Sequence, residues 1–199
     1  MKKGFTLIEM LVVIGIIAIL MGASIAGFSK MTKTAEKAKC QELVSNTATA
    51  MAVLFQKEGV WPKVMRSAGA TDGELDATTA YPLKDYMSLT TSGNNLSGLD
   101  RFGIVTPWAT AYIKSHGTGA SLSSKIGEYT IKDHILHFAL DLDGDGIIEG
   151  ANVGGESIDV RATAIVWCCG KDGKLEAYSA GLRKDDVYSF TFGQTQNVK

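Results

Sequence analysis

The residues of this chain whose types and spacing best suit chemistry lie in an acidic loop at positions 141–149. Oxygen ligands at positions 1, 3, 5, 7 and 9 of a loop, with a glycine at position 6, are typical of the first part of an EF-hand-like calcium loop. This segment follows that spacing, and it therefore predicts a Ca²⁺ site. Its candidate ligands are Asp141, Asp143, Asp145, the backbone carbonyl of Ile147, and Glu149.

The same loop departs from the calcium pattern at its last ligand. Position 12 is Asn152, where such loops carry a bidentate glutamate, so Glu156 or Asp159 would have to complete the coordination. Three carboxylates this close together repel one another unless a cation lies among them, which favours a metal. A hairpin turn rich in Asp and Gly, without a metal, is the alternative.

The three cysteines form a second candidate group. Cys40 lies on the apolar side of an expected helix, and Cys168 and Cys169 are adjacent in an expected strand. Because neighbouring strand residues point to opposite faces, only one of these two can face the helix. A disulfide between Cys40 and one of them is one hypothesis, and three buried free thiols are the alternative.

No other set of residues in the sequence predicts catalysis. His134 and His137 are three positions apart in a segment with strand character, so they would point to opposite faces and could hardly share a metal. The sequence contains no phosphate-binding loop, no catalytic-triad spacing and no CxxC pair. The net charge of −1 gives no electrostatic footprint for nucleic acid. We therefore expect neither an enzyme nor a nucleic-acid-binding protein.

The N-terminal segment is far more apolar than the rest of the chain. Hydrophobic residues make up 45% of the whole sequence but 18 of the 25 positions in 5–29, and residues 10–29 carry no charge. A helix of about 20 residues spans roughly 30 Å, the thickness of a bilayer core. Lys2 and Lys3 precede it, which predicts a cytoplasmic N-terminus and a body on the outer side. A cleaved secretory signal or a plain membrane anchor are alternatives.

One carboxylate, Glu9, lies inside this apolar segment. An acidic group in lipid is costly and usually has a specific partner. Residues 2–9, Lys-Lys-Gly-Phe-Thr-Leu-Ile-Glu, resemble the processing site of type IV pilins and type II secretion pseudopilins. The resemblance implies that a prepilin peptidase cuts after Gly4 and that Phe5 becomes the N-methylated first residue. It also implies that Glu9 neutralises the N-terminal amine of a neighbouring subunit.

A C-terminal segment resembles the same family. Residues 170–189 are similar to the calcium-stabilised closing loop of major pseudopilins, in which a Gly-x-Asp-Gly turn is followed by a pair of acids. This resemblance implies a second Ca²⁺ site with Asp172, Asp185 and Asp186 as ligands. A solvated loop without a metal is the alternative.

Beyond the apolar segment, the spacing of buried-type residues predicts that the helix continues. Cys40, Val44, Thr47, Met51 and Leu54 follow one another at intervals of 4, 3, 4 and 3 and so share one helix face. Such a face must pack on something, and a sheet is expected. Gly59 and Pro62 predict that the helix ends near residue 57, and residues 55–62 resemble the helix exit of pilins.

The rest of the chain predicts an α+β fold, in which the long N-terminal helix (a membrane half and an amphipathic half) packs on a C-terminal antiparallel sheet, as in pilins. Residues 106–112 resemble, at Pro107, Trp108 and Tyr112, the segment that opens the pseudopilin sheet. We expect strands at 134–140, 158–169, 175–179 and 187–192, a short helix at 81–90, and loops at 68–80 and 91–98.

The expected organisation is a prepilin leader (1–4), a transmembrane and polymerisation half of the helix (5–29), its amphipathic half (30–60) and a globular headpiece (61–199). The resemblance implies a structural subunit of a type IV pilus-like filament, closest to a type II secretion pseudopilin. It would be anchored by a single pass in the inner membrane with its headpiece in the periplasm. The implied partners are other copies of the chain, other pilins, the prepilin peptidase, and an assembly platform with its ATPase.

A function of another class remains open at this stage. The chain could instead be a secreted or membrane-tethered monomeric calcium-binding or adhesion module that begins with a signal sequence.

Overall fold

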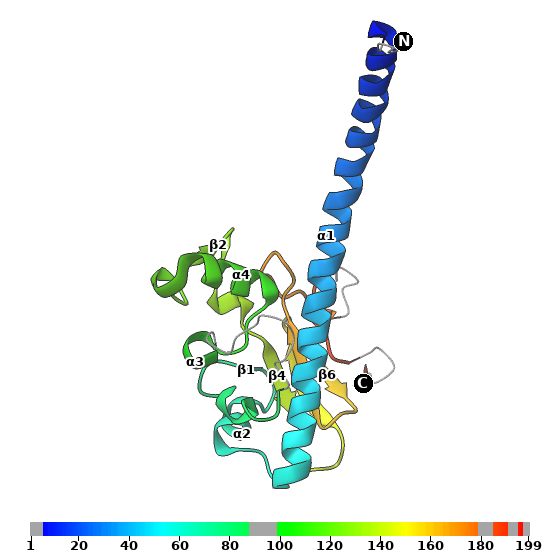
Figure 1. The fold of residues 1–199 in the computed structure, drawn as a ribbon. Coiled ribbons are helices and arrows are strands. Elements are labelled where there is room, and N and C mark those ends of the chain that lie inside the picture. Colours follow the sequence, from blue (N-terminus) through cyan, green and yellow to red (C-terminus); the bar gives the residue numbers. More distant parts are fainter. Residues whose placement is uncertain (1–5, 88–98, 179–184, 191–194, 197–199) are drawn as a thin grey trace. The chain divides into compact units, whose positions relative to one another are not determined.

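The computed structural model describes residues 6–87, 99–178, 185–190 and 195–196, and of these it leaves out the side chains at 23–30, 99–100 and 195–196 (Figure 1). The chain divides into two compact units, Met1–Glu36 and Lys37–Lys199. The helix α1, Leu7–Glu58, contributes to both of them. All the sheets belong to the second unit, whose fold is treated first.

The second unit holds several short helices and nine strands within the described residues. The α-helices after α1 are α2 (Lys63–Ala68), α3 (Leu99–Phe102) and α4 (Pro107–His116). The 3-10 helices are η1 (Tyr81–Leu83), η3 (Gly117–Gly119) and η4 (Lys132–His134). The strands are β1 (Gly73–Glu74), β2 (Lys125–Ile126), β3 (Tyr129–Thr130), β4 (His137–Leu140), β5 (Ile148–Val153), β6 (Glu156–Val160), β7 (Ala164–Cys168), β8 (Val187–Tyr188) and β9 (Thr195–Gln196).

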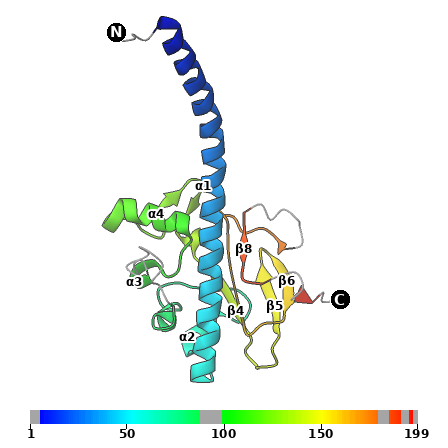
Figure 2. The same ribbon diagram turned by 45° about the vertical axis from the view of Figure 1, so that its right-hand side comes forward.

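The strands form two main sheets and a small hairpin, and all their pairings are antiparallel. The first sheet has the order β1-β4-β7-β8 and the second the order β5-β6-β9, while β2 and β3 pair with each other. In Figure 2, α2, α3 and α4 lie on one side of α1 and strands β5, β6 and β8 on the other. The α+β class with an antiparallel sheet is therefore confirmed.

Strand β7 is buried on both faces and separates two cores. Val166 and Cys168 join a hydrophobic cluster with the C-terminal half of α1, whereas Ile165 and Trp167 join a cluster with β5 and β6. Alternate residues of a strand point to opposite faces, which accounts for this division. The first sheet is thus packed between α1 and the second sheet.

The predicted face of α1 is the face that packs on the first sheet. Cys40, Val44, Thr47 and Met51 are fully buried and Leu54 is 3% exposed. The polar residues predicted for the other side are all exposed, namely Lys37, Lys39, Gln41, Glu42, Ser45 and Asn46. The one polar member of the buried face, Thr47, donates its hydroxyl hydrogen to the carbonyl of Leu43 at 2.7 Å, so its burial leaves no unmet donor.

The end of α1 is also where the sequence places it. Gly59 has φ +70°, a left-handed conformation that glycine adopts without strain, and its N–H donates to the carbonyl of Phe55 at 2.8 Å. Trp61 then stacks on Phe55 with ring centroids 4.7 Å apart, and Pro62 precedes α2. Helix α2 itself was not predicted.

Two of the strand predictions are wrong in detail. The single strand expected at 158–169 is two strands, β6 and β7, because the chain turns between Val160 and Ala164 to enter the other sheet. The strand expected from residue 134 begins at His137, since His134 ends the 3-10 helix η4. The sequence had suggested that the two histidines lie on opposite faces of one strand. That prediction is wrong, because only His137 belongs to the strand.

Other predictions for the second unit are also wrong. Residues 107–112 form the start of helix α4 rather than opening a sheet, because Pro107 stands at a helix N-terminus, where its missing N–H is not needed. Residues 81–83 form only a short 3-10 helix, and the described residues of 175–179 form no strand. The sequence also missed β1 and β5. The loop expected at 91–98 lies outside the described residues.

The packing of α1 on the sheet yields a stability prediction. Met51→Ala should lower the free energy of unfolding by about 2–5 kcal/mol, because it removes a fully buried side chain from the shared core. Asn46→Ala, on the exposed side of the same helix, is the matched control and should change it by no more than about 0.5 kcal/mol. Denaturant unfolding of the full chain in detergent measures both, and equal losses would contradict this packing.

Candidate functional site

The first candidate region is the N-terminal end of α1. The predicted processing residues Gly4 and Phe5 lie outside the described residues, and the helix begins at Leu7. Glu9 stands in its first turn, where Glu9 Oε2 accepts hydrogen bonds from the Thr6 N–H and hydroxyl, each at 2.8 Å. In return, the Glu9 N–H donates to Thr6 Oγ1 at 3.3 Å.

This reciprocal pair is a capping box, a Thr followed three residues later by a Glu, which satisfies helix N–H groups that have no partner within the helix. This cap was not predicted, although its Thr-x-x-Glu signature is present in the sequence at Thr6 and Glu9. Within a single chain, Glu9 therefore already has a local partner. Any partner from a second chain must share or displace these contacts.

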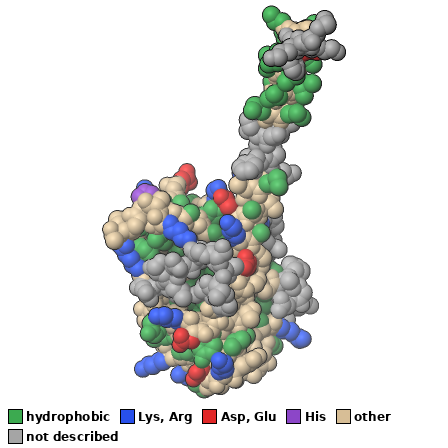
Figure 3. Space-filling view, in the orientation of Figure 1, with side chains coloured by type: hydrophobic (Ala, Val, Ile, Leu, Met, Phe, Trp, Pro, Cys, Tyr) green, Lys and Arg blue, Asp and Glu red, His purple; other side chains and the backbone are tan. Residues whose placement is uncertain are grey.

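Apolar side chains stay uncovered along the first unit. Every described side chain from 7 to 22 is exposed, and the largest exposures are those of Leu7 at 85%, Ile19 at 74% and Ile8 at 71%. Figure 3 shows hydrophobic side chains gathered along this part of α1. A soluble monomer rarely exposes so large an apolar surface unless it is a contact surface.

Among the described residues, no helix is both long enough and apolar enough to cross a membrane. The single membrane pass expected for residues 5–29 thus stays a prediction.

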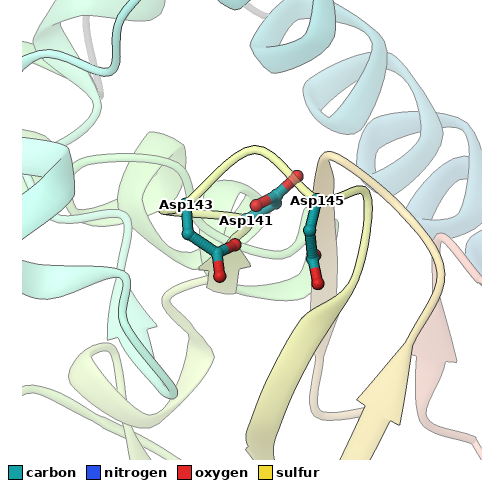
Figure 4. Close-up of side chains that lie close together, drawn as sticks. All are labelled: Asp141, Asp143 and Asp145. Atoms are coloured by element: carbon teal, nitrogen blue, oxygen red, sulfur yellow. The ribbon is translucent and has the colours of Figure 1, made fainter.

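The second candidate region is the acidic loop between β4 and β5. Asp141, Asp143 and Asp145 each offer a carboxylate oxygen, and these atoms all lie within 4.8 Å of one another (Figure 4). Within the part of the chain that the structure describes, this is the one group of three or more His, Cys, Asp or Glu side chains gathered so closely. Asp141 is 4% exposed, whereas Asp143 and Asp145 are exposed.

The loop is shaped around the carboxylate of Asp141. Its Oδ1 accepts the N–H of Gly144 at 2.7 Å and its Oδ2 accepts the N–H of Gly146 at 2.8 Å. Both glycines have left-handed backbones, with φ +83° and +85°, which most other residues would adopt only with strain. These hydrogen bonds fold the loop into a tight turn, and the carboxylates of Asp143 and Asp145 lie close to that of Asp141.

Trp61 connects this loop to the helix exit. The ring is 3% exposed, and its Nε1–H donates to the backbone carbonyl of Asp141 at 2.7 Å. Nothing local in the sequence links Trp61 to residue 141. The hydrogen bond fixes the first acidic residue of the loop against the residue that follows α1.

The remaining candidate ligands of this loop lie outside the three-carboxylate group. Ile147 donates its N–H to Asp145 Oδ1 at 2.7 Å, and Glu149 is an exposed residue of β5. Asp159 Oδ1 accepts the N–H of Gly150 at 2.8 Å, so its carboxylate supports the β5–β6 hairpin. In that same hairpin, Asn152 pairs with Ser157 and Glu156 pairs with Val153.

The acids proposed for the second loop are held by backbone N–H groups. Asp186 Oδ1 accepts from Gly170 at 3.0 Å and its Oδ2 accepts from Glu176 at 3.0 Å. Asp185 Oδ2 accepts from Lys171 at 2.7 Å, and Asp172 Oδ1 accepts from Lys174 at 2.9 Å. In the described residues, this arrangement closes the loop after β7 through hydrogen bonds.

Asp186 is the most deeply buried of these acids, at 5% exposed. Burial raises the pKa of its carboxyl, and the hydrogen bonds from Glu176, Gly170 and Tyr188 oppose that rise because they stabilise the charged form.

The three cysteines have different surroundings, and the adjacent pair at the end of β7 points in two directions. Cys168 faces α1, and its Sγ lies 2.8 Å from Cys40 Sγ, with both residues fully buried. Cys169 points elsewhere: its thiol donates to the carbonyl of Asp133 at 2.9 Å and lies 3.6 Å from His134 Nδ1. All three cysteines are free thiols in this structure.

The two histidines have separate surroundings. His134 Nδ1 lies 3.1 Å from Thr106 Oγ1, and burial lowers the pKa of His134 so that its ring is neutral near pH 7. His137 Nδ1 lies 2.7 Å from Asp72 Oδ1, and its ring stacks on Trp167 with centroids 5.9 Å apart. The two rings thus have different partners, Thr106 for His134 and Asp72 with Trp167 for His137.

Comparison with known proteins gives matches at the N-terminus and across half of the chain. Residues 1–25 match the family described as the prokaryotic N-terminal methylation motif. The type IV major pilin protein PilE of Neisseria gonorrhoeae is 28% identical over 102 residues, which is 51% of this chain and 61% of that protein. A fimbrial protein of Neisseria meningitidis serogroup B (strain ATCC BAA-335 / MC58) is 33% identical over 76 residues, or 38% of this chain and 45% of that protein.

The matched regions thus span less than two thirds of each of these relatives. No solved structure gives a significant match. The pilin relatives are structural proteins, which supports the expectation that this chain is not an enzyme. The motif at residues 1–25 and the pilin relatives agree with what residues 2–9 predict, and together they support a type IV pilin-family protein.

Proposed function

We propose that this chain is a structural subunit of a type IV pilus-like filament and that it assembles through the N-terminal half of α1 after cleavage behind Gly4. The carrying observation is the combination of an uncovered apolar helix surface at residues 7–22 with a single carboxylate, Glu9, at its start. The subunit would be stored in the inner membrane, with its headpiece in the periplasm, before it enters the filament.

The apolar surface supplies the attraction between subunits. Its exposed side chains would be buried against the same segment of neighbouring subunits, and burial of apolar surface is the main favourable term in most protein association. This attraction has no direction, so it does not set how far one helix is displaced along the next. A second interaction has to fix that displacement.

Glu9 is suited to fix the displacement. A carboxylate removed from water is strongly unfavourable unless an opposite charge reaches it. Cleavage behind Gly4 would create such a charge at the amine of Phe5, and only a correctly staggered neighbour would bring that amine to Glu9. The pair would thus select a register and contribute little net stability. The capping contacts with Thr6 keep the carboxylate satisfied until then.

Among the members of this group, the C-terminal segment favours a type II secretion pseudopilin, because residues 170–189 resemble the closing loop of major pseudopilins. The Neisseria relatives, which are named as major pilins, favour a surface pilus instead. Deleting the gene discriminates between them: loss of protein secretion supports the pseudopilin, and loss of surface filaments supports the pilus. The further partners would be a prepilin peptidase and an assembly platform with its ATPase.

We also propose that the acidic loop at 141–149 binds Ca²⁺. Three carboxylates with ligand atoms within 4.8 Å of one another suit a cation that prefers oxygen ligands. A bound ion would neutralise their mutual repulsion and stabilise the turn between β4 and β5. Through the Trp61 hydrogen bond to Asp141, it would also stabilise the exit of α1.

The mature N-terminus is the first test of this function. N-terminal sequencing and mass analysis of the protein isolated from membranes should show a chain that begins at an N-methylated Phe5. The secreted monomeric module, which is the alternative function, would begin near Gly27 instead. A mature chain that starts there would contradict the proposed function.

The role of Glu9 is tested by replacing its charge and keeping its cap. Glu9→Gln should be processed normally but should reduce filament yield about tenfold or more, because glutamine can still cap the helix but cannot pair with an amine. Thr6→Ala is the matched control, since it weakens the cap and keeps the charge. Filament yield after shearing measures both. Normal assembly of Glu9→Gln, or an equal loss in Thr6→Ala, would contradict the charge-pair role.

The calcium proposal is tested by thermal unfolding with and without the ion. At a Ca²⁺ concentration about 100 times the dissociation constant, the melting temperature should rise by about 5 °C or more. Asp143→Asn should abolish that rise. Asp172→Asn is the control, because an asparagine there can still accept the N–H of Lys174. The reverse pattern would place the ion in the second loop, and no rise in the unmodified protein would contradict calcium binding.

A further inference from the structure

The second unit contains a pair of cysteines that the proposed function does not use. Cys40 lies on the buried face of α1, Cys168 lies near the end of β7, and 128 positions separate them in sequence. Their sulfur atoms are nevertheless 2.8 Å apart, and both residues are 0% exposed. A disulfide bond is about 2.0 Å long, so less than about 1 Å of sulfur movement separates this contact from a covalent bond.

We propose that Cys40 and Cys168 form a disulfide bond in the exported protein and that Cys169 stays a thiol. This inference rests on the proposed function only for the compartment, since a headpiece in the periplasm is exposed to oxidising conditions and a cytosolic one is not. The bond would join the helix that carries the assembly segment covalently to the central strand of the sheet.

The choice of Cys168 over Cys169 follows from the direction of the two side chains. Cys168 belongs to the cluster that includes Cys40 and Val44, whereas Cys169 contacts Asp133 and His134. A bond from Cys40 to Cys169 would require the end of β7 to turn over. That would break the pairing of Cys168 with Val187 in β8.

The chemistry is an exchange with a disulfide-bearing oxidant, either a protein thiol oxidase or a small disulfide. The thiolate of one cysteine attacks the oxidant, forms a mixed disulfide and releases one oxidant sulfur. The thiolate of the other cysteine attacks that mixed disulfide, which forms the Cys40–Cys168 bond and releases the second oxidant sulfur. The two protons lost from the cysteines go to the two oxidant sulfurs, and the oxidant is reduced to a dithiol.

Burial determines when this exchange takes place. Neither sulfur is reachable by an oxidant in the folded unit, so oxidation must occur before α1 has packed on β7. Contact with Cys40 and burial both raise the pKa of Cys168. The fraction of Cys168 present as the reactive thiolate is therefore smaller in the folded state. Once formed, the bond is equally inaccessible to reductants, and it should survive in the folded protein.

The consequence would be mechanical. The assembly segment and the buried face belong to the same helix, α1, so a pull on the first part of that helix acts on the contact between α1 and the sheet. Without the bond, only noncovalent packing resists separation of the helix from β7. With it, separation requires reduction of a buried disulfide.

The direct test counts thiols in the full chain isolated from cell membranes in detergent. The protein is unfolded under acid-quenched conditions, alkylated with N-ethylmaleimide and digested, and the peptides are identified by mass spectrometry. The expected result is one alkylated residue, Cys169, and a linked peptide pair that contains Cys40 and Cys168. Three alkylated cysteines, or a link that includes Cys169, would overturn the proposal.

Unfolding of variants provides a second readout. The unmodified protein should lose on the order of 10 °C in melting temperature when a reductant is present during unfolding. Cys40→Ala and Cys168→Ala should each lose a similar amount, the double variant should lose no more than either one, and none of these should respond to reductant. Cys169→Ala is the control that should keep the response to reductant. If reductant does not change the melting temperature of the unmodified protein, Cys40 and Cys168 are packed thiols without a bond, and the proposal is overturned.

These readouts are independent of filament assembly. The thiol count is read from the headpiece peptides, and the mature N-terminus is read by sequencing, so either proposal can fail while the other holds.

Discussion

The burial of one face of α1 against the first sheet is the interaction on which the second unit depends. Cys40, Val44, Thr47, Met51 and Leu54 are almost completely withdrawn from water, and strands β4 and β7 supply the opposing side chains. This contact decides which face of β7 points at the helix, and therefore which cysteine approaches Cys40.

The features that the sequence predicted well are those coded by short-range signals. The 4-3-4-3 spacing of the buried helix face needs only the helical period, and the exit at Gly59 and Pro62 needs only the backbone preferences of these two residues. The acidic loop was found because its ligands alternate within nine residues, and three of its carboxylates do lie together. The resemblance to pilins lies in residues 2–9, and these residues fall within the N-terminal methylation motif that residues 1–25 match.

The features that the sequence missed depend on contacts between distant residues. Nothing near Trp61 indicates that its ring reaches the carbonyl of Asp141, and nothing near Cys168 indicates which neighbour it meets. Residues 158–169 look like one strand because their hydrophobicity is continuous, but the chain changes sheets within them. Residues 106–112 resemble a sheet-opening segment, but Pro107 is also a local helix-start signal, and helix α4 begins there.

Helix α1 has two parts with different uses, a buried face within the headpiece and an uncovered apolar segment that includes Glu9. We propose that this segment holds the subunits of a filament together in a register set by Glu9. Helical reconstruction of filaments that contain this chain tests the claim most directly. We expect residues 5–29 in the filament core, with the Glu9 carboxylate within hydrogen-bond distance of the Phe5 amine of a neighbouring subunit. A filament in which Glu9 faces no amine would contradict this claim, and so would a mature protein that begins near Gly27 and is a monomer.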